Sequence, residues 1–184
     1  TTAAKIEKKL GYPCFVKPAN AGSSVGITKA HNKDELIEGL KLAAAHDSKI
    51  VVEKAVVGRE IECAVLGNGS RIEASCVGEI IAAAEFYDYD AKYNNSESKT
   101  VVPAVISKEK QDEIRNMAVK VFKAVDGSGL ARVDFFVENE TENVIFNELN
   151  TLPGFTPISM YSMLWSACGK PMNVLLDELI DLAL

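Results

Sequence analysis

The sequence predicts an α+β fold, because antiparallel hairpins and amphipathic helices are expected in separate stretches of the chain. Hairpins are expected over 59–76 and 129–154. In the first hairpin, Asn68-Gly69 is typical of a type I′ turn, whose central residues need positive φ angles. A helix is expected over 107–125, where apolar residues recur at helical spacing. The 184 residues suffice for one sizeable domain or for two small lobes that share a cleft.

The other elements are expected along the chain as a helix over 1–10, a strand over 14–17, a helix over 32–45, a strand over 49–53, and helices over 159–168 and 172–184. The apolar stripe of the 107–125 helix consists of Ile114, Met117, Ala118, Val121, Phe122 and Val125. Leu164 and Trp165 are expected in the core. The segment 85–99 carries three tyrosines and one phenylalanine with little regular period. It is typical of a lid or binding loop, and equally of an Ω-loop packed by its own aromatic side chains.

Composition narrows the function classes. Hydrophobic residues make up 47% and charged residues 25%, the balance of a soluble globular protein. The formal charge of −6 does not favour a nucleic-acid partner. The four cysteines lack C-x-x-C spacing and are expected as small buried residues in a reducing compartment. With no signal peptide and no apolar run near the roughly 20 residues of a membrane helix, we expect a cytoplasmic protein without membrane insertion.

The hairpin over 129–154 carries the main candidate site. Alternation places Arg132, Asp134 and Phe136 on one face of its first strand, and Val144, Phe146, Glu148 and Asn150 on one face of its second. If Asp134 lies opposite Glu148, then Arg132 lies opposite Asn150. Opposed carboxylates about 4.5–5.5 Å apart repel unless a proton, a cation or water-filled space compensates. Adding the Asn150 amide oxygen gives an all-oxygen set that suits Mg²⁺ carrying substrate phosphates.

Alternatives remain open at this point. Acidic residues on a strand are most often its solvated face, and the same holds for Glu60 and Glu62, which share a face of the first hairpin. Arg132 favours the metal hypothesis, because a guanidinium beside a divalent cation suits charge developing on a transferred phosphoryl group. The loop over 20–27 could cradle phosphate oxygens with Lys17 as the point charge, or be a plain flexible turn.

Six motifs in order are K-P-x-N-x-G-S-S-V-G, V-V-E-K, G-R-E-I-E, F-Y-D-Y-D-A-K-Y, A-R-V-D-F-F and F-N-E-L-N-T-L-P-G-F-T-P-I-S-M-Y. Together they closely resemble the D-alanine–D-alanine ligase family of the ATP-grasp superfamily, from Lys17 nearly to the C-terminus. The resemblance implies ATP bound between two α+β lobes, with 1–53 as the remainder of the central lobe and 54–184 as the C-terminal lobe. The family's N-terminal substrate domain is absent, so the chain is expected to be a fragment, inactive alone.

The resemblance also implies site residues. The adenine hinge would be Glu53, Lys54, Ala55 and Val56, with Phe86 and Phe136 flanking the purine and Glu60 on the ribose. The other ATP-binding residues would be Lys17, Gly22, Ser23, Ser24, Val25, Lys92 and Asn147. Two Mg²⁺ (or Mn²⁺) ions would be held by Asp134, Glu148 and Asn150. Substrates would be placed by Ser159 and Met160.

The implied chemistry is ATP-dependent joining of two D-alanines through an acyl phosphate, for peptidoglycan synthesis. Arg132 and the backbone amide of Gly154 would stabilise the tetrahedral intermediate, and the lid Tyr93 would bond to Ser23. Tyr93 within D-A-K-Y is similar to the dipeptide-forming ligases, and the full-length enzyme is expected to be a homodimer. Competing hypotheses are another ATP-grasp carboxylate–amine ligase, a non-catalytic nucleotide-binding module and, more distantly, a two-carboxylate glycosidase.

Overall fold

A computed structural model describes residues 2–21, 24–81 and 99–184. Its described residues fall into two compact units. The first, unit 1, contains 2–21 and 24–56. The second, unit 2, contains 57–81 and 99–184.

Unit 1 is a small sheet covered on one face by two helices. Strands β1 (Cys14–Pro18), β2 (Thr28–Ala30) and β3 (Ile50–Lys54) form an antiparallel sheet in the order β2-β1-β3. Alternation along β1 buries Cys14 and Val16 against α1 (Thr2–Leu10) and α2 (Lys33–His46). Phe15 and Lys17 point to the opposite face, which α1 and α2 do not cover.

The start of α2 follows the expected capping pattern. The Asn32 side chain accepts hydrogen bonds from the backbone amides of Asp34 and Glu35, both at 3.0 Å. Glu35 Oε2 in turn accepts from the amide of His31 at 2.8 Å. These bonds satisfy amides that a helix leaves without internal partners in its first turn. The expected helix over 32–45 is confirmed.

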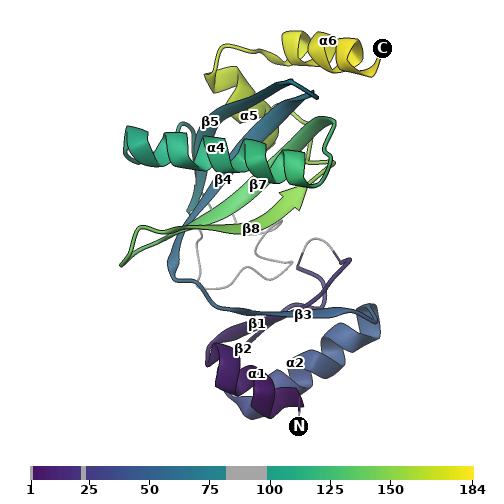
Figure 1. Cartoon of the computed structure of the whole chain (residues 1–184), viewed down its shortest axis with the longest axis vertical. Coiled ribbons are helices and arrows are strands. Elements are labelled where there is room, and N and C mark those ends of the chain that lie inside the picture. The colour runs from purple at the N-terminus through teal and green to yellow at the C-terminus, as the bar shows by residue number, and fades with distance from the viewer. Residues whose placement is uncertain (1, 22–23, 82–98) are drawn as a thin grey trace. The chain divides into compact units, whose positions relative to one another are not determined.

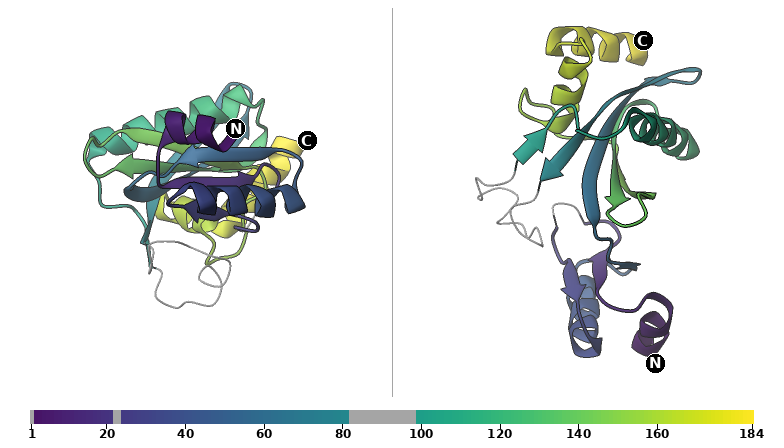
Figure 2. Two further views of the ribbon diagram at one scale, coloured as in Figure 1. Left: turned by 90° about the horizontal axis from the view of Figure 1, so that it is seen from below. Right: turned by 90° about the vertical axis from the view of Figure 1, so that its left-hand side faces the viewer.

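Unit 2 is built on a five-stranded antiparallel sheet in the order β6-β5-β4-β7-β8. Its strands are β4 (Gly58–Asn68), β5 (Arg71–Ile81), β6 (Lys99–Val101), β7 (Gly129–Glu138) and β8 (Val144–Asn150). Helix α4 (Lys108–Ala124) covers one face, and α5 (Met160–Ala167) and α6 (Met172–Ala183) lie on the other (Figures 1 and 2). Both expected hairpins and the α+β class are confirmed.

The β4–β5 turn differs from the prediction. Asn68 pairs with Arg71, so the two central residues of the turn are Gly69 and Ser70. Gly69 has a φ of 54° while Ser70 does not have a positive φ, which fits a type II′ turn. The physical reason is that Asn68 is held in the strand: its amide donates to Leu182 O at 2.8 Å and accepts from Gly129 N at 2.7 Å.

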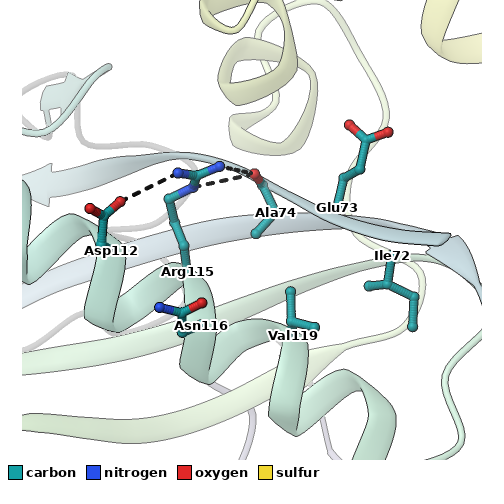
Figure 3. Close-up of a pocket in the computed structure, with 7 residues that line it drawn as sticks. All are labelled: Ile72, Glu73, Ala74, Asp112, Arg115, Asn116 and Val119. Atoms are coloured by element: carbon teal, nitrogen blue, oxygen red, sulfur yellow. Dashed lines mark hydrogen bonds and ion pairs between the residues drawn. The ribbon is translucent and has the colours of Figure 1, made fainter. Parts of the chain in front are cut away.

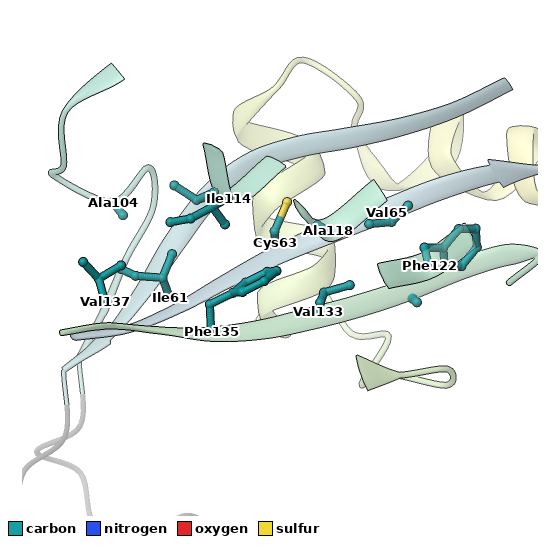
Figure 4. Packing of buried hydrophobic residues seen from close by; sticks show 12 residues of the cluster. Ile61, Cys63, Val65, Ala104, Ile114, Ala118, Phe122, Val133, Phe135 and Val137 are labelled. Atoms are coloured by element: carbon teal, nitrogen blue, oxygen red, sulfur yellow. The ribbon is translucent and has the colours of Figure 1, made fainter. Parts of the chain in front are cut away.

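The core between the sheet and α4 is shown in Figure 4. Ile114, Ala118 and Phe122 point from α4 into it, as the helical spacing predicted. They meet Cys63 and Phe135, among other alternate residues of β4 and β7. The prediction is wrong for Val125, which is 56% exposed because the helix ends at Ala124 and Val125 is its C-cap.

Among the described residues, α5 and α6 cover only part of the opposite face. Ala64 and Leu66 pack against Tyr161, Leu164 and Trp165, which confirms that Leu164 and Trp165 belong to the core. The Tyr161 hydroxyl donates to Val65 O at 3.0 Å and fixes α5 to β4. These contacts cover the end of the face toward the β4–β5 turn. The candidate site occupies the same face nearer the start of β4.

Candidate functional site

At the polar end of the second hairpin, the pairing on which the metal hypothesis depended is confirmed. Asp134 on β7 lies opposite Glu148 on β8, and Arg132 lies opposite Asn150. Directly opposed residues of an antiparallel pair share a face. The Asn150 amide nitrogen confirms this placement, because it donates to Asp134 Oδ2 at 2.9 Å and to Glu148 Oε1 at 3.4 Å.

A β-bulge changes what the rest of β8 presents. Glu148 pairs with Asp134 but Phe146 already pairs with Phe135, so Asn147 is the extra residue of the strand. The bulge reverses the alternation before it. Phe146 stacks edge-on against buried Phe135, with ring centroids 6.2 Å apart. The expectation that Val144 and Phe146 share a face with Glu148 is therefore wrong, and Ile145 takes their place.

Strand β4 adds a third carboxylate, which its place on a hairpin face predicts to be solvated. Glu62 lies opposite Asp134 on the other side of β7. Glu62, Asp134 and Glu148 therefore form one row across three strands, and the neighbouring row holds Arg132 and Asn150. Glu62 is 5% exposed and Asp134 2%. The sequence shows that Glu62 lies two residues after Glu60 and so shares its face. It does not show which strand pairs with this one.

Arg132 lies at the centre of the cluster. Its Nε and Nη2 donate to Asp134 Oδ1 and Oδ2, both at 2.8 Å, and its Nε lies 3.1 Å from Glu62 Oε2. Burial lowers the pKa of Arg132, but the hydrogen bonds to Asp134 and the charges of Glu62, Asp134 and Glu148 raise it by more. The net pKa lies above its ordinary value, so this guanidinium stays charged.

The donor set fits a hard divalent cation. Carboxylate and amide oxygens are the ligands that Mg²⁺ prefers. Three carboxylates around one guanidinium make a strongly negative surface, which a divalent cation would balance. Asn150 turns its NH₂ group toward Asp134, so a ligand role requires its amide to turn over. Among the described residues, no group of three His, Cys, Asp or Glu side chains is arranged as a ready metal cage.

Next to the acidic row, the same face becomes apolar. Phe136 pairs with Glu60 on one side and with Ile145 on the other. All three are half-buried. The apolar side chains of Phe136 and Ile145 can pack against a planar ring. The neighbouring Glu60 carboxylate can accept hydrogen bonds from hydroxyl groups attached to that ring system. Ile145 was missed by the sequence reasoning because the bulge at Asn147 was not foreseen.

The loop after β8 brings together three predicted substrate residues. A Cβ on Gly154 would lie 3.0 Å from Ser159 Oγ. Ser159 is the N-cap residue of α5, and its Oγ accepts from Thr156 N at 3.1 Å. Met160 is 6% exposed and packs against Gly78, so its backbone rather than its side chain is available to a ligand.

In unit 1 two of the predicted ATP-binding residues, Lys17 and Glu53, share one face of the sheet. Lys17 Nζ and Glu53 Oε2 form an ion pair at 2.6 Å on the face away from α1 and α2. Ser24 has a φ of 62° in the loop before β2, and neighbouring Val25 is 40% exposed. Lys54 ends β3 and is exposed, while Ala55 and Val56, the last residues of the unit, are half-buried. Gly22, Ser23, Phe86, Lys92 and Tyr93 lie outside the described residues.

A separate open pocket lies on the α4 side of the sheet (Figure 3). It has a volume of about 420 Å³ and lies between β5 and α4. Arg115 lines it and donates to Ala74 O and Ser75 O at 3.0 and 2.9 Å. Since none of the predicted residues lines this pocket, it is not the candidate site.

Solved ligases match nearly the full length of this chain. The D-Ala:D-Ser ligase VanG from Enterococcus faecalis matches with a TM-score of 0.88 and 41% identity, over 98% of this chain and 52% of that one. The D-alanine–D-alanine ligase from Coxiella burnetii matches with a TM-score of 0.85 and 38% identity, over 99% and 47%. The fold is that of the ATP-grasp class.

The sequence comparison narrows the class to a family. Residues 1–181 match the family described as D-ala D-ala ligase C-terminus, and the chain belongs to it. The D-alanine–D-alanine ligase of Acetivibrio thermocellus is 59% identical over 179 residues, which are 97% of this chain and 47% of the relative. That of Clostridium tetani is 57% identical over 180 residues, 98% and 50%. The chain thus spans about half the length of these curated relatives. No helix among its described residues is long and apolar enough to cross a membrane.

Proposed function

We propose that the protein at its full natural length joins two D-alanines with ATP, as its curated relatives are named to do. The observation that carries this proposal is the polar cluster on the sheet of unit 2. Arg132 forms ion pairs with both Glu62 and Asp134, and Asn150 donates to Asp134. A ligase of this kind must bring a carboxylate to a triphosphate. Fixed cations and dipoles lower the cost of that encounter.

The residues of unit 2 take distinct roles in this proposal. Asp134, Glu148 and Asn150 would hold Mg²⁺ or Mn²⁺, two ions by family likeness. A bound cation supplies charge neutralisation of the phosphate oxygens. Phe136 and Ile145 offer apolar surface to the purine, and Glu60 accepts hydrogen bonds from the ribose hydroxyls.

Arg132 and the amide of Gly154 act on the reacting centre. The carboxylate of the first D-alanine attacks the γ-phosphorus of ATP, ADP leaves, and an acyl phosphate forms. The amine of the second D-alanine then attacks the acyl carbon, and phosphate leaves with loss of a proton from nitrogen. Arg132 stabilises the oxyanion of the tetrahedral intermediate, because its guanidinium stays charged. Ser159 and the backbone of Met160 place the second D-alanine.

Unit 1 supplies phosphate contacts in the same proposal. Lys17, Ser24 and Val25, with Gly22 and Ser23, hold the phosphates, and the segment from Glu53 to Val56 binds adenine. In this proposal unit 1 takes the place of the central lobe predicted over 1–53 and unit 2 that of the C-terminal lobe predicted over 54–184, although the boundary between the two units falls between Val56 and Val57. Phe86, Lys92, Tyr93 and Asn147 keep the ATP-binding and lid roles that the family implies. We also propose that the full-length enzyme is a cytoplasmic homodimer; light scattering tests the dimer.

The test is a coupled assay on the full-length protein. We expect ADP and D-alanyl-D-alanine with D-alanine alone, and little mixed product when D-serine or D-lactate competes. If the protein preferred another acceptor over D-alanine, it would be a carboxylate–amine ligase with a different substrate. Mg-ATP binding without any turnover would instead favour a non-catalytic nucleotide-binding module.

A further inference from the structure

Glu62 is nearly buried but stands in none of the roles assigned above. It lies opposite Asp134 in the register of β4 and β7, with an exposed fraction of 5%. Like charges opposed across a strand pair repel, so a buried pair of carboxylates needs a cation between them. Arg132 is that cation: its Nε donates to Asp134 Oδ1 at 2.8 Å and lies 3.1 Å from Glu62 Oε2, within ion-pair distance.

Asp134 and Glu62 hold Arg132 unequally, and this difference becomes important when a metal ion binds to Asp134. Asp134 engages Arg132 with both oxygens, through Nε and Nη2. A carboxylate held in this way must release at least one of these bonds to accept a divalent cation. Arg132 would then be free to turn away from the reacting centre unless a second carboxylate held it.

We propose that Glu62 is a positioning residue for Arg132: it holds the guanidinium through Nε when Asp134 turns to the metal. This inference rests on the proposed function. With Nε held by Glu62, the Nη2 donor that Asp134 releases becomes available to the substrate. A guanidinium has donors in a fixed planar fork, so fixing one nitrogen fixes the direction of the others. Lysine cannot be held in this way.

A matched control exists in the same sheet. Arg59 donates through Nε and Nη2 to Glu79 at 2.7 and 2.6 Å, and Glu79 is 8% exposed. Glu79 is therefore a buried carboxylate in a similar ion pair, with no place in the proposed site. If Glu62 were only structural, Glu62→Gln and Glu79→Gln would have the same consequences.

The experiment measures Mg²⁺-dependent ADP affinity by calorimetry and steady-state kinetics, on the full-length protein. In Glu62→Gln, Arg132 turns wholly to Asp134 and competes with the metal. We expect the affinity to fall about fivefold or more and kcat to fall at least about tenfold, with the KM for D-alanine little changed. Glu79→Gln should change each value less than about twofold. Thermal unfolding verifies that both variants are folded.

Repeating the Glu62→Gln substitution in an Arg132→Lys protein distinguishes positioning of Arg132 from a simple loss of negative charge. In Arg132→Lys protein there is no Nε to hold, so adding Glu62→Gln should change affinity less than about twofold. An equal loss in both backgrounds, or equal behaviour of Glu62→Gln and Glu79→Gln, overturns the inference. If wild type binds Mg-ADP but forms no dipeptide, the ligase proposal fails alone, and the affinity comparison still decides the role of Glu62.

Discussion

Asp134 and Glu148 lie directly opposite each other on β7 and β8, with both carboxylates on one face of the sheet. Arg132 and Asn150 occupy the neighbouring row and bond to them. Charge placed on that row is therefore balanced by one fixed guanidinium and whatever cation the site binds.

Arg132 should be a stability element as well as a site residue. Arg132→Met leaves Glu62 and Asp134 buried without their ion pair, so we expect a loss of about 3 kcal/mol in the free energy of unfolding. The pKa of Arg132 is raised in the folded state. Its contribution is thus fully present below the pKa of an unfolded arginine and is lost only as pH rises through the folded value.

Urea unfolding of wild type and Arg132→Met, with Arg71→Met as an exposed control, measures this loss. The loss should be at least as large at about pH 9 as at about pH 6, because two opposed carboxylates buried without a cation destabilise the variant more as they lose their protons. A loss no larger than that of Arg71→Met would contradict the buried ion pair.

Gly78 should set how closely α5 approaches the sheet. A Cβ at this position would lie 2.7 Å from Met160 Sδ and 3.1 Å from Leu164 Cδ2. Gly78→Val should therefore displace the start of α5 and cost about 2 kcal/mol of stability. Since Ser159 and Met160 begin that helix, we expect the KM for the second D-alanine to rise more than the KM for ATP. Equal rises would argue against a substrate role for this end of α5.

The cysteines should differ sharply in reactivity. Burial raises the pKa of both Cys63 and Cys76 to about 12, with the contact to Cys168 also raising that of Cys76. The reactive thiolate of either is therefore scarce at about pH 8. Cys168 is exposed. Mass spectrometry after brief iodoacetamide treatment should find Cys168 modified first, and early modification of Cys63 in folded protein would contradict its burial.

Strict alternation along each strand predicted which side chains share a face and, with Asp134 taken opposite Glu148, placed Arg132 opposite Asn150. That rule failed at Asn147, where the packing of Phe146 on Phe135 selects a bulge. The Asn68-Gly69 turn failed for a related reason: Asn68 bonds to Leu182, which is distant in sequence. Glu62 could not be placed because its role depends on β4 pairing with β7, a long-range contact that no local pattern encodes.

The most direct measurement is Mg²⁺-dependent ADP binding to full-length wild type and Asp134→Asn protein, by calorimetry. The amide is nearly isosteric with the carboxylate but is a weaker ligand for a hard cation. We predict that the wild-type protein binds ADP more tightly when Mg²⁺ is present, and that Asp134→Asn loses about tenfold or more of this gain while remaining folded. An undiminished Mg²⁺ effect in Asp134→Asn would contradict a metal–phosphate site on this face of the sheet.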